Sequence, residues 1–186
     1  MPFASHSGVR LFWRLDGAND RPAIILLNSI GMDITLWDTT VPHLIDAFRV
    51  VRLDSRGHGA SDAPEGDYTL SMLADDVIRV MDAARIDRTA IAGVSLGGMI
   101  AMELALRYPE RVLALALICT SANMDREVWN ERVATVRGRR RDLRSGNGPI
   151  SFSEVHASPS RDHRKRTSRA VGHTRRGLRR SRSCNP

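Results

Sequence analysis

The sequence predicts one α/β domain in which helices flank a mainly parallel β-sheet. Two observations carry this prediction: short unbroken apolar runs recur along residues 1–137, and amphipathic helical patterns alternate with them. Unbroken apolar runs are typical of parallel strands that are buried on both faces, and the helices would form the crossovers between them. The chain has 186 residues and 42% hydrophobic content, which suffices for one sizeable core.

Six segments carry the pattern of a strand. Residues 2–6 and 9–15 flank the turn dipeptide Ser7-Gly8 and predict an opening hairpin. Four apolar runs then predict the core strands, at Ala23–Leu27, Val50–Leu53, Ala90–Ala92 and Val112–Cys119. Periodicity alone would also allow a helix in the last run, where Cys119 is interpreted as a small buried hydrophobe.

Two segments carry the pattern of a helix. From Thr69 to Arg85, apolar residues recur at helical spacing on one face. The charged residues of this segment fall on the opposite face, at Asp75, Asp76, Arg79 and Asp82. Thr69 is the expected N-cap, because its hydroxyl can accept a hydrogen bond from the first turn. The second helix is expected from Leu96 to Tyr108, where Pro109 stops it.

The positive charge of the chain belongs to its C-terminal part. The formal net charge is +7, but residues 1–137 carry a net of −4 and residues 138–186 a net of +11. The C-terminal part is dominated by Arg, Ser, Gly, His and Pro, and its apolar residues are too few to bury a core. We therefore expect residues 1–137 to form the folded domain and residues 138–186, the basic segment, to be disordered or irregular.

The basic segment has two alternative origins. The abrupt change near Arg137 favours a reading-frame shift within a longer GC-rich gene, because out-of-frame GC-rich codons often encode Arg, Gly, Ser and Pro. The alternative is a genuine basic extension. Because this segment lacks interleaved aromatic residues and a groove-reading motif, any binding of nucleic acid by it would be weak and non-specific.

The cysteines and the N-terminus indicate the cellular compartment in which the protein is expected. Cys119 and Cys184 form neither a disulfide framework nor a metal-ligand spacing. The N-terminus lacks the pattern of a signal peptide, and no apolar run approaches the ~18 residues of a membrane span. We therefore expect a soluble cytoplasmic protein with no bound metal and no membrane partner, whose oligomeric state the sequence does not indicate.

The strongest local signal for catalysis is the segment Gly93-Val94-Ser95-Leu96-Gly97. It lies between an expected strand and an expected helix, so the serine would sit at a sharp, strained turn with its hydroxyl exposed. The N-terminus of the helix would direct free N–H groups at the same place and favour developing negative charge. The pattern predicts that Ser95 is a nucleophile and that its turn supplies part of an oxyanion hole; a plain structural turn is the alternative.

Two polar loops follow neighbouring core strands. Asn28-Ser29-Ile30-Gly31 ends one of these strands, and Asp54–Asp62 follows the next. In the second loop we expect glycines to allow a tight path and Asp54 and Arg56 to anchor it through charged hydrogen bonds. His58 invites a role as general base, but we interpret it as scaffold because a base must reach the nucleophile.

These segments together resemble α/β-hydrolases, and most specifically the 3-oxoadipate enol-lactonases. The resemblance spans about residues 2–137. Besides the serine segment and the two polar loops, it includes Tyr108–Val112 and Glu127–Val133. The pair Asn28-Ser29 makes the resemblance specific to the enol-lactonases, since other hydrolases of this fold commonly have His-Gly at these positions. The resemblance implies an α/β-hydrolase fold and hydrolysis of the enol-lactone of 3-oxoadipate in the β-ketoadipate route of aromatic breakdown, without a metal or organic cofactor.

The resemblance also implies roles for individual residues. Ser95 would attack the lactone carbonyl, and the backbone N–H groups of Ile30 and Leu96 would form the oxyanion hole. Trp129 and Arg132 fall where the family begins its helical cap over the site, and both are candidates for substrate binding. Arg132 could pair with the substrate carboxylate; an ordinary solvated helix charge is the alternative.

The sequence departs from the family in its remaining catalytic residues. In this fold the chain order is serine, acid, histidine, and the acid and histidine follow later strands that this sequence lacks. Asp125, near where the cap would begin, is a weak substitute for the acid. The remaining histidines have no scaffold to hold them, at His156, His163 and His173. We therefore expect an α/β-hydrolase fold truncated before its last strands and an impaired enzyme.

Three interpretations of function follow. The first is a carboxylic-ester hydrolase acting on a small ester or lactone, with enol-lactonase as the specific hypothesis. Within the fold, an esterase, a haloperoxidase-like enzyme or a carbon–carbon bond hydrolase is the nearest alternative. The second is a non-catalytic protein whose basic segment binds nucleic acid, which the missing groove-reading motif disfavours. The third is an inert fragment of enzymatic ancestry.

Overall fold

The computed structural model describes residues 3–123 and residue 127. These residues form one six-stranded sheet in the order β1-β2-β4-β3-β5-β6. Its strands are β1 (Phe3–His6), β2 (Val9–Asp16), β3 (Ala23–Leu27), β4 (Arg49–Leu53), β5 (Thr89–Val94) and β6 (Val112–Ile118). The α-helices are α1 (Leu70–Ala83) and α2 (Leu96–Arg107), and the short 3₁₀ helices are η1 (Ile34–Trp37), η2 (Val41–His43) and η3 (Pro109–Arg111).

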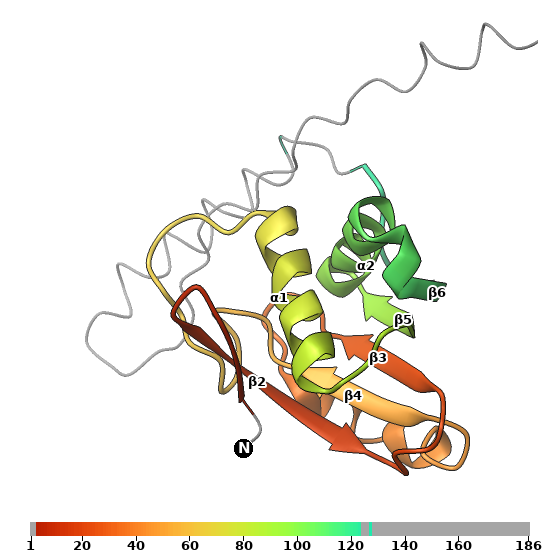
Figure 1. Ribbon diagram of the computed structural model, residues 1–186. Helices are drawn as coiled ribbons and strands as arrows, with labels where there is room; N and C mark the ends of the chain where they lie inside the picture. The colour runs from red at the N-terminus through yellow and green to blue at the C-terminus, as the bar shows by residue number, and fades with distance from the viewer. Residues whose placement is uncertain (1–2, 124–126, 128–186) are drawn as a thin grey trace, which may run out of the picture.

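The sheet begins antiparallel and continues parallel. β1 pairs with β2, and β2 with β4, in antiparallel register, whereas β4, β3, β5 and β6 pair in parallel. The expected hairpin and the four expected core strands are all present (Figure 1). The run at Val112–Ile118 is a strand and not a helix. The prediction of a mainly parallel sheet with flanking helices is confirmed.

Side chains of the central strands alternate between two cores. On β3, Ile25 and Leu27 join the core formed with α1 and α2, whereas Leu26 joins a smaller core on the opposite face. The smaller core includes Trp37 of η1 and Val41 of η2. Figure 1 shows α1 and α2 side by side over the sheet. Both faces of β3 are thus covered, as its unbroken apolar run requires.

Short 3₁₀ turns connect β3 to β4 on the second face. Residues 33–48 contain η1 and η2 in place of one long helix, and Pro42 lies in the first turn of η2. No element is predicted here from the sequence, because 3₁₀ turns are too short to show a helical period.

α1 begins at its expected cap, but one of its charges differs from the prediction. The Thr69 hydroxyl accepts a hydrogen bond of 3.1 Å from the Met72 N–H. Asp76, predicted on the polar face, is only 1% exposed, and its carboxylate accepts two hydrogen bonds of 2.6 Å from the Arg56 guanidinium. His6 of β1 contacts the same carboxylate at 2.9 Å. The helical period cannot show that segments from elsewhere in the chain cover this side of the helix.

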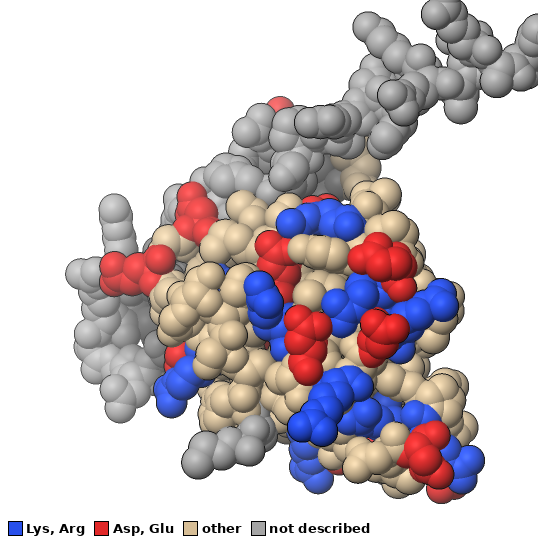
Figure 2. All heavy atoms as spheres, viewed as in Figure 1, with Lys and Arg blue, Asp and Glu red and all other residues tan. Residues whose placement is uncertain are grey.

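The outer surface of the two α-helices carries charges of both signs. Arg107 of α2 pairs with Asp75 of α1 at 2.7 Å, and Arg111 pairs with Asp82 at 2.9 Å. On the face drawn in Figure 2, acidic and basic side chains are interspersed. In the part of the chain that the structure describes, no helix is long and apolar enough to cross a membrane.

β6 has an exposed apolar surface. Its exposed large side chains are Leu113, Leu115, Leu117 and Ile118. Cys119, predicted as a buried hydrophobe, is exposed as well. The prediction for Cys119 is wrong, because an apolar run in the sequence does not show whether another segment packs against it. Within the described residues, β6 pairs with β5 along one edge only.

Candidate active site

Ser95 lies at the junction of β5 and α2, the position predicted from the sequence. Its backbone has φ 52° and ψ −113°, a conformation that residues with side chains rarely adopt. Such strain costs about 1–3 kcal/mol and persists only where the surroundings hold the residue in place. This is the backbone expected of a nucleophile elbow, a sharp strand-to-helix turn that presents a serine hydroxyl above the sheet.

The glycines of the serine turn leave no room for a side chain. A Cβ on Gly93 would collide with the Gly97 carbonyl, and a Cβ on Gly97 would collide with the Leu27 carbonyl. A Cβ on Gly98 would collide with the Thr120 side chain. The turn is therefore packed closely against the ends of the neighbouring strands.

Two contacts from the end of β6 hold Ser95. Its N–H donates to the Ile118 carbonyl at 2.9 Å, and the Thr120 hydroxyl donates to its carbonyl at 2.7 Å. The same carbonyl accepts hydrogen bonds from Gly98 and Met99 in the first turn of α2, at 3.0 and 3.1 Å. Sequence reasoning missed Thr120. Its place directly beyond the expected strand next to β5 is a signal that could have found it.

The two predicted oxyanion donors lie on segments that contact each other. Leu96 is the first residue of α2, and Ile30 follows β3. Gly97 packs against the carbonyls of Leu27 and Asn28, so the turn after β3 lies beside the serine turn. Within the described ranges, neither the Ile30 nor the Leu96 N–H donates a hydrogen bond to another residue. Their role as oxyanion donors stays a prediction.

Asn28 fastens the start of the turn after β3. Its side chain is 3% exposed, donates to the Leu53 carbonyl at 3.0 Å and accepts from the Trp37 indole N–H at 2.8 Å. Asn28 thus ties the end of β3 to the end of β4 and to η1. Asn28 occupies the position where hydrolases of this fold commonly have His, and its two hydrogen bonds hold the turn after β3 in place.

Asp54 anchors the loop after β4, as predicted. Its carboxylate accepts hydrogen bonds from the N–H groups of Ile34 at 2.8 Å and Ala60 at 2.9 Å. Burial raises the pKa of Asp54, and these two hydrogen bonds oppose the rise. Arg56 anchors the same loop through its buried pair with Asp76. The two charges thus hold the loop against η1 and α1.

His58 is buried in the same loop, and both of its ring nitrogens are engaged. Nδ1 lies 3.1 Å from the Arg56 carbonyl, and Nε2 lies 3.1 Å from the Gly31 backbone nitrogen. Because a carbonyl only accepts and a backbone N–H only donates, the ring is neutral and carries its proton on Nδ1. Burial lowers the pKa of His58, while the Arg56 carbonyl and the Asp54 charge oppose this. This geometry fits the interpretation of His58 as scaffold.

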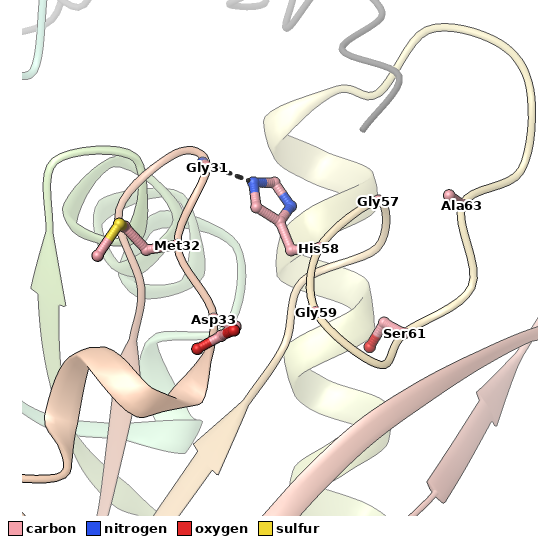
Figure 3. A pocket seen from close by; sticks show the side chains of 8 residues that line it. All are labelled: Gly31, Met32, Asp33, Gly57, His58, Gly59, Ser61 and Ala63. Atoms are coloured by element: carbon pink, nitrogen blue, oxygen red, sulfur yellow. Dashed lines mark hydrogen bonds between the residues drawn. The ribbon is translucent and has the colours of Figure 1, made fainter. Parts of the chain in front are cut away.

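A pocket of about 470 Å³ lies between the turn after β3 and the loop after β4 (Figure 3). Its lining residues are Gly31, Met32, Asp33, Gly57, His58, Gly59, Ser61 and Ala63. In Figure 3, His58 points from one wall of the pocket toward Gly31 on the other. The volume suits a small molecule. Ser95 is absent from the lining, so the pocket is not assigned as the reaction site.

The remaining predicted residues fall outside the described ranges. These are the candidates for substrate binding and for the acid and base: Asp125, Trp129, Arg132, His156, His163 and His173. Within residues 3–123 and 127, no side chain makes a hydrogen bond to the Ser95 hydroxyl. In the same ranges, no group of three or more His, Cys, Asp and Glu side chains could hold a metal ion.

The parallel sheet and the strained serine turn after β5 define the class of protein. The sequence profile of the alpha/beta hydrolase fold matches residues 22–172, and the chain belongs to this family. The matched range extends past residue 137, and the domain boundary expected there stays a prediction.

Individual relatives bear out the more specific resemblance. The chain is similar to 3-oxoadipate enol-lactonase 2 of Acinetobacter baylyi, with 35% identity over 130 residues, 69% of this chain and 49% of that protein. It is similar to the crystal structure of the enol-lactonase from Burkholderia xenovorans, with a TM-score of 0.70 and 40% identity over 73% of this chain and 54% of that one. A hydrolase structure from Pseudomonas aeruginosa has the same TM-score at 44% identity, over 73% and 52% of the two chains. The chain therefore spans about half the length of the relatives it matches.

Proposed function

We propose that this chain carries the nucleophile of a serine hydrolase that acts on carboxylic esters or lactones, and that Ser95 is this nucleophile. The observation that carries the proposal is the strained backbone of Ser95, held by β6 and by the first turn of α2. Positive φ also occurs at Ser7 in the hairpin turn, but at Ser95 it is combined with ψ −113° and with closely packed glycines, and this strain must be offset by other contacts.

The proposed reaction has two stages. In the first, Ser95 Oγ attacks the carbonyl carbon while a base takes its proton, and the N–H groups of Ile30 and Leu96 stabilise the oxyanion. The carbon–oxygen bond to the leaving group then breaks, the leaving oxygen takes the proton from the base, and an acyl-enzyme remains. In the second stage, water attacks this ester, and the serine recovers its proton as the acid departs. The resemblance implies a histidine as the base and an aspartate that orients it, and within the described residues we assign neither.

The enol-lactone of 3-oxoadipate is the substrate we favour. The similarity to two enol-lactonases supports this choice, as does the pair Asn28-Ser29 in the turn after β3. In this proposal Arg132 pairs with the free carboxylate of the substrate, and Trp129 is a second candidate for substrate binding. The reaction would place the enzyme in the β-ketoadipate route of aromatic breakdown.

Covalent labelling tests the nucleophile. A version of the chain with the reading frame restored after Arg137 is incubated with a fluorophosphonate, and the modified residue is located by intact-mass and peptide mass spectrometry. We expect one label, at Ser95, which Ser95→Ala removes and which Ser121→Ala, an exposed control near the turn, leaves in place. Labelling that persists in Ser95→Ala would overturn the proposal.

A substrate panel tests the specific activity. Any turnover should be faster with the enol-lactone than with p-nitrophenyl acetate or a dienoate that requires carbon–carbon cleavage. A preference for either of the other two compounds would favour the alternative activities of this fold.

A further inference from the structure

The predicted oxyanion donor Ile30 lies between two side-chain hydrogen bonds. Asn28, two residues before it, is fixed to Trp37 and to the Leu53 carbonyl. Gly31, the residue after it, donates its N–H to Nε2 of His58. The first contact fixes the turn to β4 and η1, and the second fixes it to the loop after β4.

Gly31 adopts a left-handed backbone conformation in this turn. Its φ is +76°, and a Cβ placed on it would meet nothing within 4 Å. The glycine therefore serves the backbone conformation and not the avoidance of a collision. The turn has one hydrogen bond of its own, from the Met32 N–H to the Ser29 carbonyl at 3.2 Å, and the contact with His58 is a further restraint on its glycine, the residue with the greatest backbone freedom.

We propose that His58 is a positioning residue of the oxyanion hole, whose neutral ring holds the Gly31 amide and thereby aims the Ile30 N–H at the serine turn. This inference rests on the proposed function, because it requires Ser95 as the nucleophile and Ile30 as a donor. His58 does not touch the substrate or exchange a proton with it. It acts through the backbone of the turn.

The contact depends on the protonation state of His58. A proton on Nε2 would turn the acceptor into a donor that faces the Gly31 N–H, and the hydrogen bond would be lost. The carboxylates near the ring are Asp54 at the end of β4 and Asp33, which lines the same pocket at the start of η1. Asp54 and the nearby backbone carbonyls favour the charged ring, while burial opposes it more strongly. The turn should therefore be intact at neutral pH and should loosen in acid.

Three variants distinguish the effect of the hydrogen-bond acceptor at Nε2 of His58 from the effect of protonating the ring. His58→Gln can place an amide oxygen near the position of Nε2 and does not titrate. His58→Leu removes the acceptor while it retains an apolar side chain of similar size. His6→Gln is the matched control, because His6 is also a part-buried, hydrogen-bonded histidine but contacts Asp76 and not the turn.

Two measurements on the version with the reading frame restored after Arg137 test the effect of these variants. In NMR spectra of ¹⁵N-labelled protein, the Gly31 and Ile30 amide resonances should move together as His58 titrates, and His58→Gln should abolish this movement. The rate of fluorophosphonate labelling at Ser95 should fall about tenfold in His58→Leu, less than the 10²–10³ lost when an oxyanion donor itself is removed. His58→Gln should recover most of this rate and show a flatter pH profile, whereas His6→Gln should behave as the unmodified chain does.

The outcomes distinguish the inference from the proposed function. If Ser95 is labelled and His58→Leu changes neither the rate nor the Ile30 resonance, the inference is wrong and the proposed function stands. If Ser95 is not labelled at any pH in the version with the reading frame restored after Arg137, the proposed function fails and the inference fails with it. If His58→Leu does not fold, identical pH profiles of the unmodified chain and His58→Gln would still overturn the inference.

Discussion

Ser95 keeps a backbone conformation that would relax without its partners. The Thr120 hydroxyl and the Ile118 carbonyl bind its carbonyl and its amide, at 2.7 and 2.9 Å. Both partners come from the end of β6, so the neighbouring strand holds the serine turn. Strain of about 1–3 kcal/mol is within the range that such hydrogen bonds, at roughly 1 kcal/mol each, and close glycine packing can offset together.

Thr120→Val should lower the free energy of unfolding by about 1 kcal/mol, because valine keeps the shape of threonine but loses the hydroxyl. It should also slow the labelling of Ser95, since the serine turn gains freedom. Urea unfolding followed by circular dichroism measures the first effect, and mass spectrometry measures the second. Thr39→Val, at an exposed position, is the control. Equal stability and equal labelling in the two variants would show that Thr120 does not hold the turn.

His58 should make the stability of the fold depend on pH. Burial lowers the pKa of the folded ring, whereas the unfolded chain titrates near the ordinary value of about 6.5. As the pH falls, the unfolded state binds a proton first, so the folded state loses stability from about pH 6.5 downwards until its own ring is protonated. The unfolding free energy of the unmodified chain minus that of His58→Gln should therefore decrease between pH 8 and pH 5. Urea titrations at several pH values test this, and a constant difference would contradict the assignment of a buried neutral ring.

Residues that act through their own backbone could be predicted from the sequence. The serine turn needs glycine two residues before and two residues after Ser95, and the cap of α1 needs a hydroxyl at Thr69, so each leaves a local signature. Asn28 and Thr120 act through residues distant along the chain, and no local pattern encodes such contacts. The serine turn and the cap of α1 could therefore be predicted from the sequence, whereas the contacts that support the serine turn could not.

At the scale of elements, a buried ion pair fixes α1 to the loop after β4. Arg56 and Asp76 are 5% and 1% exposed in their side chains and meet at 2.6 Å. The adjacent Asp75 pairs with Arg107 at the surface, where both side chains are about one-third exposed. The helical period assigns both aspartates to one polar face, because it shows which way a side chain points but not which other segments pack there. The strands were easier to predict from the sequence, since an unbroken apolar run indicates burial directly.

The two neighbouring aspartates should differ strongly in their effect on stability. Asp76→Ala should cost about 3–5 kcal/mol, because it leaves the Arg56 charge buried without its partner. Asp75→Ala should cost about 1 kcal/mol or less, since a solvent-exposed ion pair contributes little. Urea unfolding of both variants on the same day and in the same buffer measures the difference. Similar losses for the two substitutions would mean that the Arg56 pair is solvated in the protein.

At the scale of the whole molecule, the apolar side chains exposed on β6 should govern behaviour in solution. No charged residue lies within β6, which is an edge strand among the described residues, and an exposed, uncharged edge strand can pair with another copy. We expect the purified chain to self-associate as its concentration rises, and light scattering should show this. The double substitution Leu113→Lys with Leu117→Lys should reduce the association. Leu106→Lys, on α2 at 76% exposure, controls for apolar surface away from the strand. An equal reduction by the control would contradict a specific role of β6.

The chain matches about half of the length of its relatives. We expect activity to depend on the other half, which lies outside the match. Ser95 at its normal pKa is a poor nucleophile, and it needs a histidine held within reach by a carboxylate. We predict that the chain as written hydrolyses the enol-lactone with no more than the roughly 10³–10⁴-fold acceleration over water that remains when triad members are lost.

Hydrolysis of 3-oxoadipate enol-lactone tests the central claim most directly, namely that Ser95 is the nucleophile of an α/β-hydrolase. The rate is measured for the chain as written, for a version with the reading frame restored after Arg137, and for each of them with Ser95→Ala. We predict a fast reaction in the restored version, loss of that reaction with Ser95→Ala, and a rate for the chain as written that is lower by orders of magnitude. If the restored version keeps its full rate with Ser95→Ala, Ser95 is not the nucleophile. If the chain as written matches the restored version, the basic segment supplies a working base and our account of residues 138–186 is wrong.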